Sequence, residues 1–307
     1  MLRDPDLPHA VAVVCHDAGA CNLILPWLQR PDLQVRAVMQ GPALALWRAR
    51  FCDATLCSSL QQALAGVQLL LTGTGWASTL EHDARVLAQC LQLRNAAVID
   101  HWVNYPDRFV FDGQQQWPTE FWVTDEEAVQ LACQHFPQHR VRCYENRYLQ
   151  EQLQAIKPLR SGQADSPPGD VLLVMEPVRS NWGRGVAGEW QALDYFMQWR
   201  AAAGIADGTT VRLRPHPSDA PGKYGDWLAR HPGVLLDHHA SLSQAINGAR
   251  WVVGCESQAL VVALAAGRQV WSSLPPWAPA CRLPHAGVQR LADAVQKQTQ
   301  RRAPVAC

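Results

Sequence analysis

The chain has 307 residues, enough for two domains of about 150 residues each, and its 27 basic residues balance 27 acidic ones. This balance excludes a strongly charged surface for nucleic acid or an anionic membrane, and 48% hydrophobic residues exclude a disordered chain. Ten cysteines without a CxxC pair indicate free thiols in a reducing compartment, not a disulfide framework or a zinc site.

The first half of the sequence alternates short apolar runs with helical patterns. Buried strands are predicted at His9–Cys15, Val35–Met39, Val67–Leu71, Ala96–Ile99 and Glu120–Val123. Helices are predicted from about Asn22 to Gln29, over Ala43–Phe51, from Ser78 or Thr79 onward, and over Glu126–Cys133. Strands that are apolar throughout are typical of a parallel sheet covered by helices on both faces, so this half is predicted to be a doubly wound α/β lobe.

The pattern breaks at residues 157–170, where three prolines and two glycines show no periodicity and indicate a linker. After it, strands are predicted at Val171–Met175, Thr210–Leu213, Val234–Leu236, Trp251–Val253 and Gln269–Trp271. Helices are predicted at Glu189–Ala203, Asp226–Arg230, Leu242–Gly248, Ser257–Ala266 and Leu291–Gln298. The chain is therefore predicted to be an α/β protein of two doubly wound, Rossmann-like lobes, residues 1–156 and 171–307.

The polar residues that follow the strands are the candidate site, because ligands of open α/β sheets bind beyond the carboxyl ends of the strands. These segments are His16–Gly19, Thr72–Gly75, Asp100–His101, Glu176, Arg214–Pro217 and Gly254–Ser257. Loops at strand ends are polar in many α/β proteins, so the clustering indicates function more than any one residue does.

Two segments of the second lobe favour phosphate binding. VRLRPHPSD places Arg214 and His216 after a strand, in a loop stiffened by two prolines, where a guanidinium and an imidazole could clamp a phosphate and neutralise a leaving group. GCES then leads into a helix at Ser257, whose first N–H groups and positive dipole end favour an anion. The alternatives are a proline-rich turn with a surface histidine and an ordinary capped helix.

RPHP followed by GCESQALVVALAAGRQV resembles the C-terminal half of GT-B glycosyltransferases. It is similar to bacterial sialyltransferases and polysialyltransferases, and about as similar to CDP-glycerol-type polymer transferases. The resemblance implies two lobes that face a central cleft and a nucleotide-linked donor, with CMP as one candidate nucleotide. It also implies that His216 contacts the nucleotide phosphate and assists the leaving group, that Ser257 binds phosphate, and that Glu256 binds the ribose hydroxyls.

The first lobe is expected to supply the acceptor site and the general base, because an inverting transfer needs a group that takes the proton of the acceptor hydroxyl. Asp17 is the preferred base, since HDAGAC sets a carboxylate on a loop of small residues that a sugar can approach. Asp100 is the second choice, and a helix N-cap is the alternative for Asp17. Further candidates for the base or for binding the acceptor or sugar are His16, Gly19, Thr74, Glu81, His82 and His101.

Aromatic and basic residues in loops offer further contacts. Indole rings stack on sugars and bases, and four tryptophans fall in predicted loops: Trp76, Trp102, Trp182 and Trp277. Core packing is the alternative for each of them. Arg179 and Arg184 in PVRSNWGRG could cradle an anionic sugar or a phosphate, and a solvated loop is the alternative. The TGTG turn could also hold a phosphate.

Together with these patterns, the resemblance implies a metal-independent GT-B glycosyltransferase that moves a sugar from a nucleotide donor to a glycan or protein acceptor, with a sialic-type nonulosonic acid as one candidate sugar. No DxD-like acidic pair follows a strand, so no essential metal is expected, and no cofactor besides the donor. The lack of a GxGxxG turn disfavours a dinucleotide-dependent dehydrogenase. The alternatives are a nucleotide-sugar epimerase or hydrolase on the same fold and a non-catalytic ligand-binding protein of a polysaccharide cluster.

The expected location follows from two patterns. The N-terminal segment lacks a basic region followed by a long apolar run, so no signal peptide is expected. No run of about 18 apolar residues occurs, so no membrane-spanning segment is expected. We therefore expect a cytoplasmic protein. The balance of basic and acidic residues predicts that it has no nucleic-acid partner.

Overall fold

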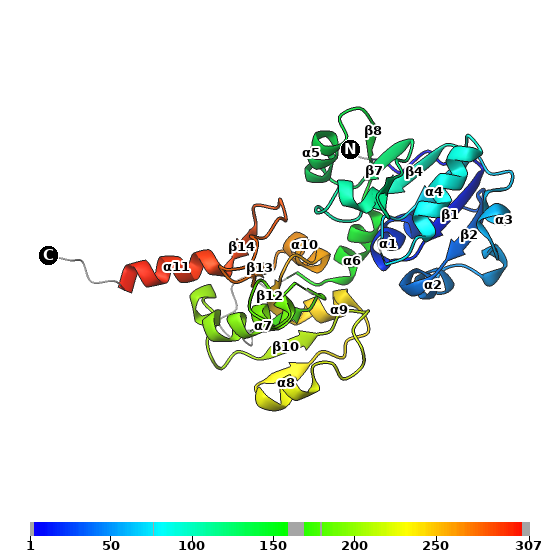
Figure 1. Ribbon diagram of the computed structural model, residues 1–307. Helices are drawn as coiled ribbons and strands as arrows, with labels where there is room; N and C mark the ends of the chain where they lie inside the picture. Colours follow the sequence, from blue (N-terminus) through cyan, green and yellow to red (C-terminus); the bar gives the residue numbers. More distant parts are fainter. Residues whose placement is uncertain (1–2, 76, 159–168, 179, 303–307) are drawn as a thin grey trace. The chain divides into compact units, whose positions relative to one another are not determined.

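The computed structural model describes residues 3–75, 77–158, 169–178 and 180–302 of the chain. The chain divides into two compact units, unit 1 (Met1–Gln150) and unit 2 (Glu151–Cys307), each with its own parallel sheet (Figure 1). Most of the predicted linker, residues 159–168, lies outside the described residues. Helix α6 (Arg147–Ala155) contains the point in the sequence at which unit 1 ends and unit 2 begins.

Unit 1 is built on a six-stranded sheet in the order β2-β1-β3-β4-β7-β8. Its strands are β1 (Ala10–Cys15), β2 (Gln34–Met39), β3 (Leu69–Thr72), β4 (Asn95–Val98), β7 (Glu120–Val123) and β8 (Arg140–Cys143). Its helices are α1 (Ala18–Trp27), α2 (Gly41–Arg48), α3 (Leu60–Leu64), α4 (Leu80–Cys90) and α5 (Glu126–His135). The short elements are the 3-10 turns η1 (Asp53–Thr55) and η2 (Pro106–Phe109), and a hairpin of β5 (Val110–Phe111) with β6 (Gln114–Gln115).

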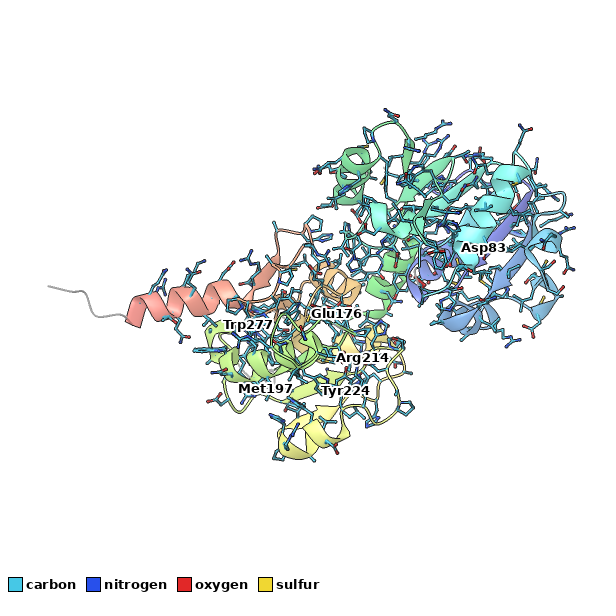
Figure 2. All side chains as sticks on the ribbon, viewed as in Figure 1. Asp83, Glu176, Met197, Arg214, Tyr224 and Trp277 are labelled. Atoms are coloured by element: carbon cyan, nitrogen blue, oxygen red, sulfur yellow. The ribbon has the colours of Figure 1, made fainter. Side chains whose placement is uncertain are left out.

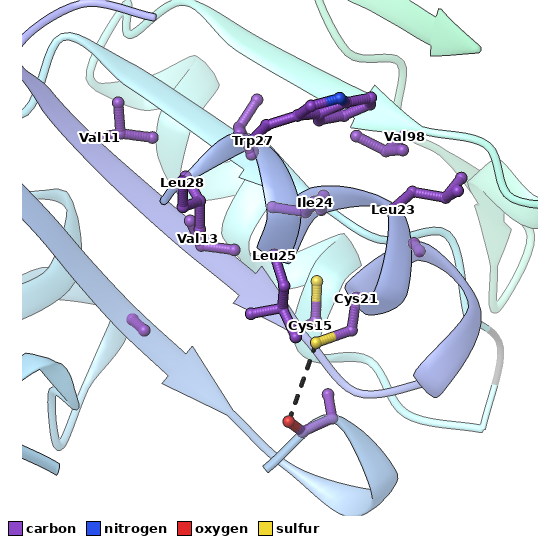
Figure 3. Close-up of a cluster of buried hydrophobic side chains, with 14 of the residues drawn as sticks. Val11, Val13, Cys15, Cys21, Leu23, Ile24, Leu25, Trp27, Leu28 and Val98 are labelled. Carbon is purple, nitrogen blue, oxygen red and sulfur yellow. Dashed lines mark hydrogen bonds between the residues drawn. The ribbon is translucent and has the colours of Figure 1, made fainter. Parts of the chain in front are cut away.

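The two faces of strand β1 explain why helices cover both sides of this sheet. Val11, Val13 and Cys15 pack with residues of α1 and α2 in one buried cluster, which Figure 3 shows around α1. Ala12 and Val14 pack instead with residues of α3 and α4. Because successive side chains of a strand point to opposite faces, a strand that is apolar throughout needs a helical layer on each side. The prediction of a doubly wound first lobe is confirmed.

Unit 2 repeats this plan with the strand order β11-β10-β9-β12-β13-β14. Its strands are β9 (Asp170–Val174), β10 (Val211–Arg214), β11 (Val234–Leu236), β12 (Ala249–Gly254), β13 (Gln269–Ser272) and β14 (Val288–Arg290). Its helices are α7 (Gly188–Trp199), extended by the 3-10 turn η3 (Arg200–Ala203), α8 (Gly225–Arg230), α9 (Leu242–Asn247), α10 (Gln258–Ala265) and α11 (Leu291–Arg302). The predicted fold class, two Rossmann-like α/β lobes, is confirmed.

The sequence patterns do not predict the edge strands β8 and β14. Their sequences are RVRC and VQR, and the polar residues interrupt the apolar run by which the central strands are recognised. In β8, Arg140 and Arg142 lie 3.6 and 2.8 Å from the buried carboxylate of Glu120 in β7. An edge strand meets solvent along one side, so it can carry more charged residues than a strand covered on all sides. The short α3 and the β5–β6 hairpin are missed as well.

Two further features of the described part of the chain concern its cysteines and its helices. All nine cysteines in the described ranges are free thiols. No helix within those ranges is both long and apolar enough to cross a bilayer.

Candidate active site

The strand order places one topological switch point in each sheet. In unit 1 the chain goes from β1 to β2 on one side and then to β3 on the other, so the loops after β1 and β3 diverge. In unit 2 the same divergence lies between β9 and β12. Open α/β sheets bind ligands at such points. The loops that start there carry Asp17 and Gly75 in unit 1, and Glu176 and Ser257 in unit 2.

Asp17 lies directly after β1, at the start of α1. It occupies the N-cap position with φ −91° and ψ 160°, but its side chain caps no N–H group. Its Oδ1 atom is buried and has no hydrogen-bond partner. The pKa of Asp17 is raised to about 6, mainly by burial and then by the charge of Asp100, while Arg108 opposes the shift. A carboxyl group with this pKa can accept and release a proton near neutral pH.

Two glycines make room for the carboxylates of this site. A Cβ atom at Gly75 would lie 2.1 Å from Oδ2 of Asp17, and a Cβ atom at Gly19 would lie 1.7 Å from Oδ2 of Asp100. Real Cβ atoms essentially never come closer than 3.0 Å to such atoms, so a side chain at either position would displace the carboxylate from where it lies. The TGTG turn therefore receives a carboxylate at Gly75, and that charge would repel a phosphate.

Arg108, in the η2 turn, joins two of the strand-end loops. Its Nη1 atom donates to Oγ1 of Thr74 at 2.9 Å and to Oδ1 of Asp100 at 3.0 Å. The Arg108 side chain is 8% exposed and the Asp100 side chain 16%. The structure thus brings two predicted site residues, Thr74 and Asp100, into contact with one buried arginine. Sequence reasoning missed Arg108, because no local pattern marks a residue that reaches the site by a tertiary contact.

Glu81 holds the loop that carries Asp17. It lies in the first turn of α4, is 1% exposed, and accepts the backbone N–H of His16 through Oε1 at 2.7 Å. Its Oε2 atom is buried without a partner. Burial raises the pKa of Glu81 to about 7; the His16 N–H lowers it and the charge of Asp17 raises it. A second titratable carboxyl group therefore lies behind the predicted base.

The two histidines of the predicted acceptor site have different surroundings. His16 packs against Gly41, which has φ 51° and where a Cβ atom would lie 2.7 Å from the imidazole ring. The Nδ1 atom of His16 is buried without a hydrogen-bond partner. The ring of His101 lies 5.6 Å from that of Trp102, centroid to centroid. Trp102 is 6% exposed and donates to Asp125 at 3.0 Å, so its ring fills the core of unit 1.

In unit 2, Glu176 connects the loops on both sides of the switch point. It follows β9 (Figure 2), and its Oε1 atom accepts the backbone N–H of Glu256, which follows β12. Burial raises the pKa of Glu176 to about 7, and the Glu256 N–H opposes part of this shift. The start of α10 is therefore attached to a carboxyl group that changes its charge close to neutral pH.

Glu256 and Ser257, both predicted to bind the nucleotide, have partners within unit 2. Arg282 binds Glu256 through both its guanidinium and its backbone, with Nη2 at 2.8 Å from Oε2 and its backbone N–H at 2.6 Å from Oε1. Ser257 caps α10 by accepting the N–H of Ala259 at 3.2 Å. The capped helix that was the alternative for Ser257 is therefore present, and binding of an anion at the same helix start stays a prediction.

The surroundings of His216 favour the neutral form of its ring. Its Nδ1 atom accepts the backbone N–H of Ser218 at 3.2 Å and lies 2.7 Å from the hydroxyl of the same residue. Burial lowers the pKa of His216, so the neutral ring, with its hydrogen on Nε2, is favoured near neutral pH. Arg214 (Figure 2) donates to Asp237 at 2.5 Å and to the carbonyl of His239 at 2.9 Å. Of this pair, His216 is the better placed to donate to a ligand.

Replacing Glu176 with glutamine is expected to reduce the amount of folding stability that the protein loses as the pH rises. A carboxyl group whose pKa rises from 4.5 to about 7 on folding stabilises the fold below pH 4.5, and this stabilisation is lost as pH rises to about 7. Glutamine keeps the acceptor oxygen and does not titrate. The free energy of unfolding of the variant, measured with denaturant, should therefore rise relative to that of the wild type by on the order of 2–3 kcal/mol as the pH goes from 4.5 to 8. A difference in free energy of unfolding that stays the same from pH 4.5 to 8 would contradict this prediction. As a control, replacing the exposed Glu126 with glutamine should produce no such rise.

A separate cavity of about 250 Å³ lies on the surface of unit 2 beside α7. Arg184 and Trp277 line it, and the Arg184 guanidinium lies 3.7 Å from the centre of the Trp277 ring. Trp277 also donates to Gln191 at 2.7 Å, so its ring is held in place although it is 37% exposed (Figure 2). Two other predicted loop contacts, Arg179 and Trp76, lie outside the described residues.

Within residues 3–75, 77–158, 169–178 and 180–302, no three His, Cys, Asp or Glu side chains are arranged to hold a metal ion.

Comparisons with solved structures identify the class of fold. A Listeria monocytogenes protein assigned as a UDP-N-acetylglucosamine 2-epimerase has a TM-score of 0.59 at 10% identity, over 95% of this chain and 87% of that one. The UDP-GlcNAc 2-epimerase of Neisseria meningitidis, solved with UDP-GlcNAc bound, has a TM-score of 0.54 at 12% identity, over 95% and 90%. No protein-family model and no curated protein matches the sequence. The fold is the two-lobed GT-B type.

Proposed function

We propose that this protein is a glycosyltransferase that moves a sugar from a nucleotide-linked donor to a hydroxyl group of a glycan or protein acceptor, with Asp17 as the general base. The observation that carries the proposal is the state of the Asp17 carboxyl group. Its Oδ1 atom is buried without a partner at the switch point of unit 1, and its pKa is about 6. Above pH 6 the group is ionised and can take the proton of an attacking hydroxyl.

His216 and the start of α10 are proposed to bind the donor phosphates. A neutral His216 can donate through Nε2, and the first N–H groups of a helix favour an anion. The Neisseria structure of the same fold contains UDP-GlcNAc, which makes uridine diphosphate sugars the first donors to test, with CMP-linked sialic-type sugars next. Because all nine described cysteines are free, we propose that the enzyme acts in the reducing cytoplasm.

A nucleotide-sugar epimerase or hydrolase is the second candidate. The observation that favours it is the presence of two carboxyl groups, Asp17 and Glu81, with pKa values of about 6 and about 7. Between these values one group can hold a proton while the other accepts one, which is what acid–base chemistry on the donor alone requires. Two structures that share the fold are also named as UDP-GlcNAc 2-epimerases.

Incubation of the protein with nucleotide sugars, with and without acceptors, separates these functions. Uridine, cytidine and guanosine diphosphate sugars and a CMP-linked sialic acid would be followed by release of nucleotide. Turnover that depends on an acceptor supports the transferase, and fast turnover of a donor alone supports the epimerase or hydrolase. Thermal stabilisation by a nucleotide without any turnover would indicate a non-catalytic binding protein. A metal-independent enzyme should keep its rate in a chelator such as EDTA.

Replacing His216 with alanine is expected to weaken nucleotide binding about tenfold. The loss corresponds to one hydrogen bond from a neutral donor to a charged acceptor, worth on the order of 1.5 kcal/mol. Calorimetric titration with the nucleotide that stabilises the wild type would measure it. The exposed His238 follows β11 in the same unit, and His238→Ala should bind like the wild type. Equal affinity of His216→Ala and the wild type would remove His216 from the donor site.

A further inference from the structure

The two aspartates at the unit 1 site have unequal partners. Asp100 forms an ion pair with Arg108 at 3.0 Å, with both side chains largely buried. The buried Oδ1 atom of Asp17 has no partner, and no ion pair joins Asp17 to a described residue. Two carboxylates close together would otherwise share a proton between them, and either could act as the base. Arg108 forms an ion pair with Asp100, while its charge acts on Asp17 without such a pair.

The same guanidinium also fixes the loop against which Asp17 lies. Arg108 donates to Thr74 at 2.9 Å, and the next residue, Gly75, is the one whose Cβ atom would lie 2.1 Å from the Asp17 carboxylate. A third contact, from Nε of Arg108 to the carbonyl of Val103 at 3.1 Å, holds the arginine in place. Arg108 therefore acts on Asp17 through its charge and through the loop after β3, and it binds Asp100 directly.

We infer that Arg108 is a positioning residue that gives the two carboxylates different roles. It binds Asp100, and Asp17 is then the group that exchanges a proton with the substrate. The inference rests on the proposed function. The acceptor O–H bond breaks, its proton goes to Asp17, and the acceptor oxygen bonds to the anomeric carbon. The bond from that carbon to the donor phosphate breaks, and the nucleotide leaves with the electron pair. Asp100 can accept a hydrogen bond from the acceptor in addition to the one that it accepts from Arg108.

The charged groups around Asp17 predict opposite effects for two variants. Asp100 raises the pKa of Asp17 and Arg108 lowers it, in addition to the effect of burial. Glu81 and His16 also adjoin the loop that carries Asp17, and they are unchanged in both variants. Removing the arginine should therefore raise the pKa of Asp17, and removing Asp100 should lower it.

Titration of the aspartate carboxyl carbons by NMR tests the inference in the full-length protein without any substrate. The wild type should show Asp17 with a midpoint at about pH 6. Arg108→Gln should move this midpoint up by about one pH unit, and Asp100→Asn should move it down. Arg108→Lys keeps the charge and should move it less. Arg94→Gln removes an arginine that pairs with Glu120 at 3.1 Å and should leave Asp17 unchanged.

The outcomes separate this inference from the proposed function. Shifts in the two expected directions, with the pH midpoint of turnover following the midpoint of Asp17, support both. If the Asp17 midpoint shifts as expected but no donor is turned over, the proposed function is wrong and the inferred role of Arg108 is still supported. An Asp17 midpoint that does not move in Arg108→Gln, or moves down, would overturn the inference even if turnover is lost. If Arg108→Gln does not fold, Asp100→Asn and Arg108→Lys decide by the same criterion.

Discussion

Replacing Asp17 with asparagine is expected to slow acceptor-dependent turnover by a factor between about 10² and 10⁴, the usual contribution of a positioned general base. Asparagine has nearly the same size but cannot take the proton of the acceptor hydroxyl. In the wild type the rate should rise with pH through about 6, because only ionised Asp17 is a base. The variant should lose this rise. Initial rates from pH 5 to 8, with nucleotide release as the signal, would measure both effects.

The control for this variant is Asp53→Asn. Asp53 lies in η1, is exposed, and pairs with Arg48 at 3.1 Å on the surface of unit 1. Its replacement should leave the rate and the pH profile unchanged. Asp17→Asn should also be no less stable than the wild type above pH 6, since it removes a carboxylate whose burial opposes ionisation. A wild-type rate in Asp17→Asn would exclude Asp17 as the base and leave Asp100 as the next candidate.

Replacing Gly75 with alanine is expected to lower the rate by about 10²-fold, the cost of moving a reacting group by about 1 Å. The new Cβ atom would lie 2.1 Å from Oδ2 of Asp17 and 2.3 Å from Oδ1, so the carboxylate would have to leave its position. Gly75 does not have a positive φ, so alanine adds no backbone strain. Rates, together with unfolding temperatures, would separate loss of position from loss of fold.

A matched glycine serves as the control. Gly233 also lacks a positive φ, and a Cβ atom there would meet no atom within 4 Å. Gly233→Ala should therefore retain full activity. If Gly75→Ala were as active as Gly233→Ala, the placement of the Asp17 carboxylate would not matter to the reaction.

The fold could be predicted from the sequence wherever a strand is buried on both faces. The run AVAVVC of β1 and the run EFWV of β7 are apolar or buried throughout, and the strand Glu120–Val123 is predicted with its observed bounds. Edge strand β8 could not be predicted, because Arg140 and Arg142 find their partner, Glu120, on another strand. A pattern in one segment cannot show a charge that a distant residue neutralises.

The site could be predicted in part for a similar reason. Asp17 and Asp100 follow strands, and the rule that ligands bind at strand ends selects them from the sequence alone. Arg108 and Arg282 could not be selected, because each enters its site from a connecting segment and is recognised only by its contact with Asp100 or Glu256. The burial that shifts the pKa of Asp17 also depends on packing, which a linear pattern does not contain.

The close approach of Gly19 to Asp100 and of Gly75 to Asp17 has a use in genome searches. Each aspartate is compatible with its present position only if the opposite residue has no side chain, so the four residues form two interdependent pairs. A distant homologue that has both pairs should hold its two carboxylates in the same way even at very low overall identity. A homologue in which a larger residue replaces either glycine should hold one of the carboxylates elsewhere.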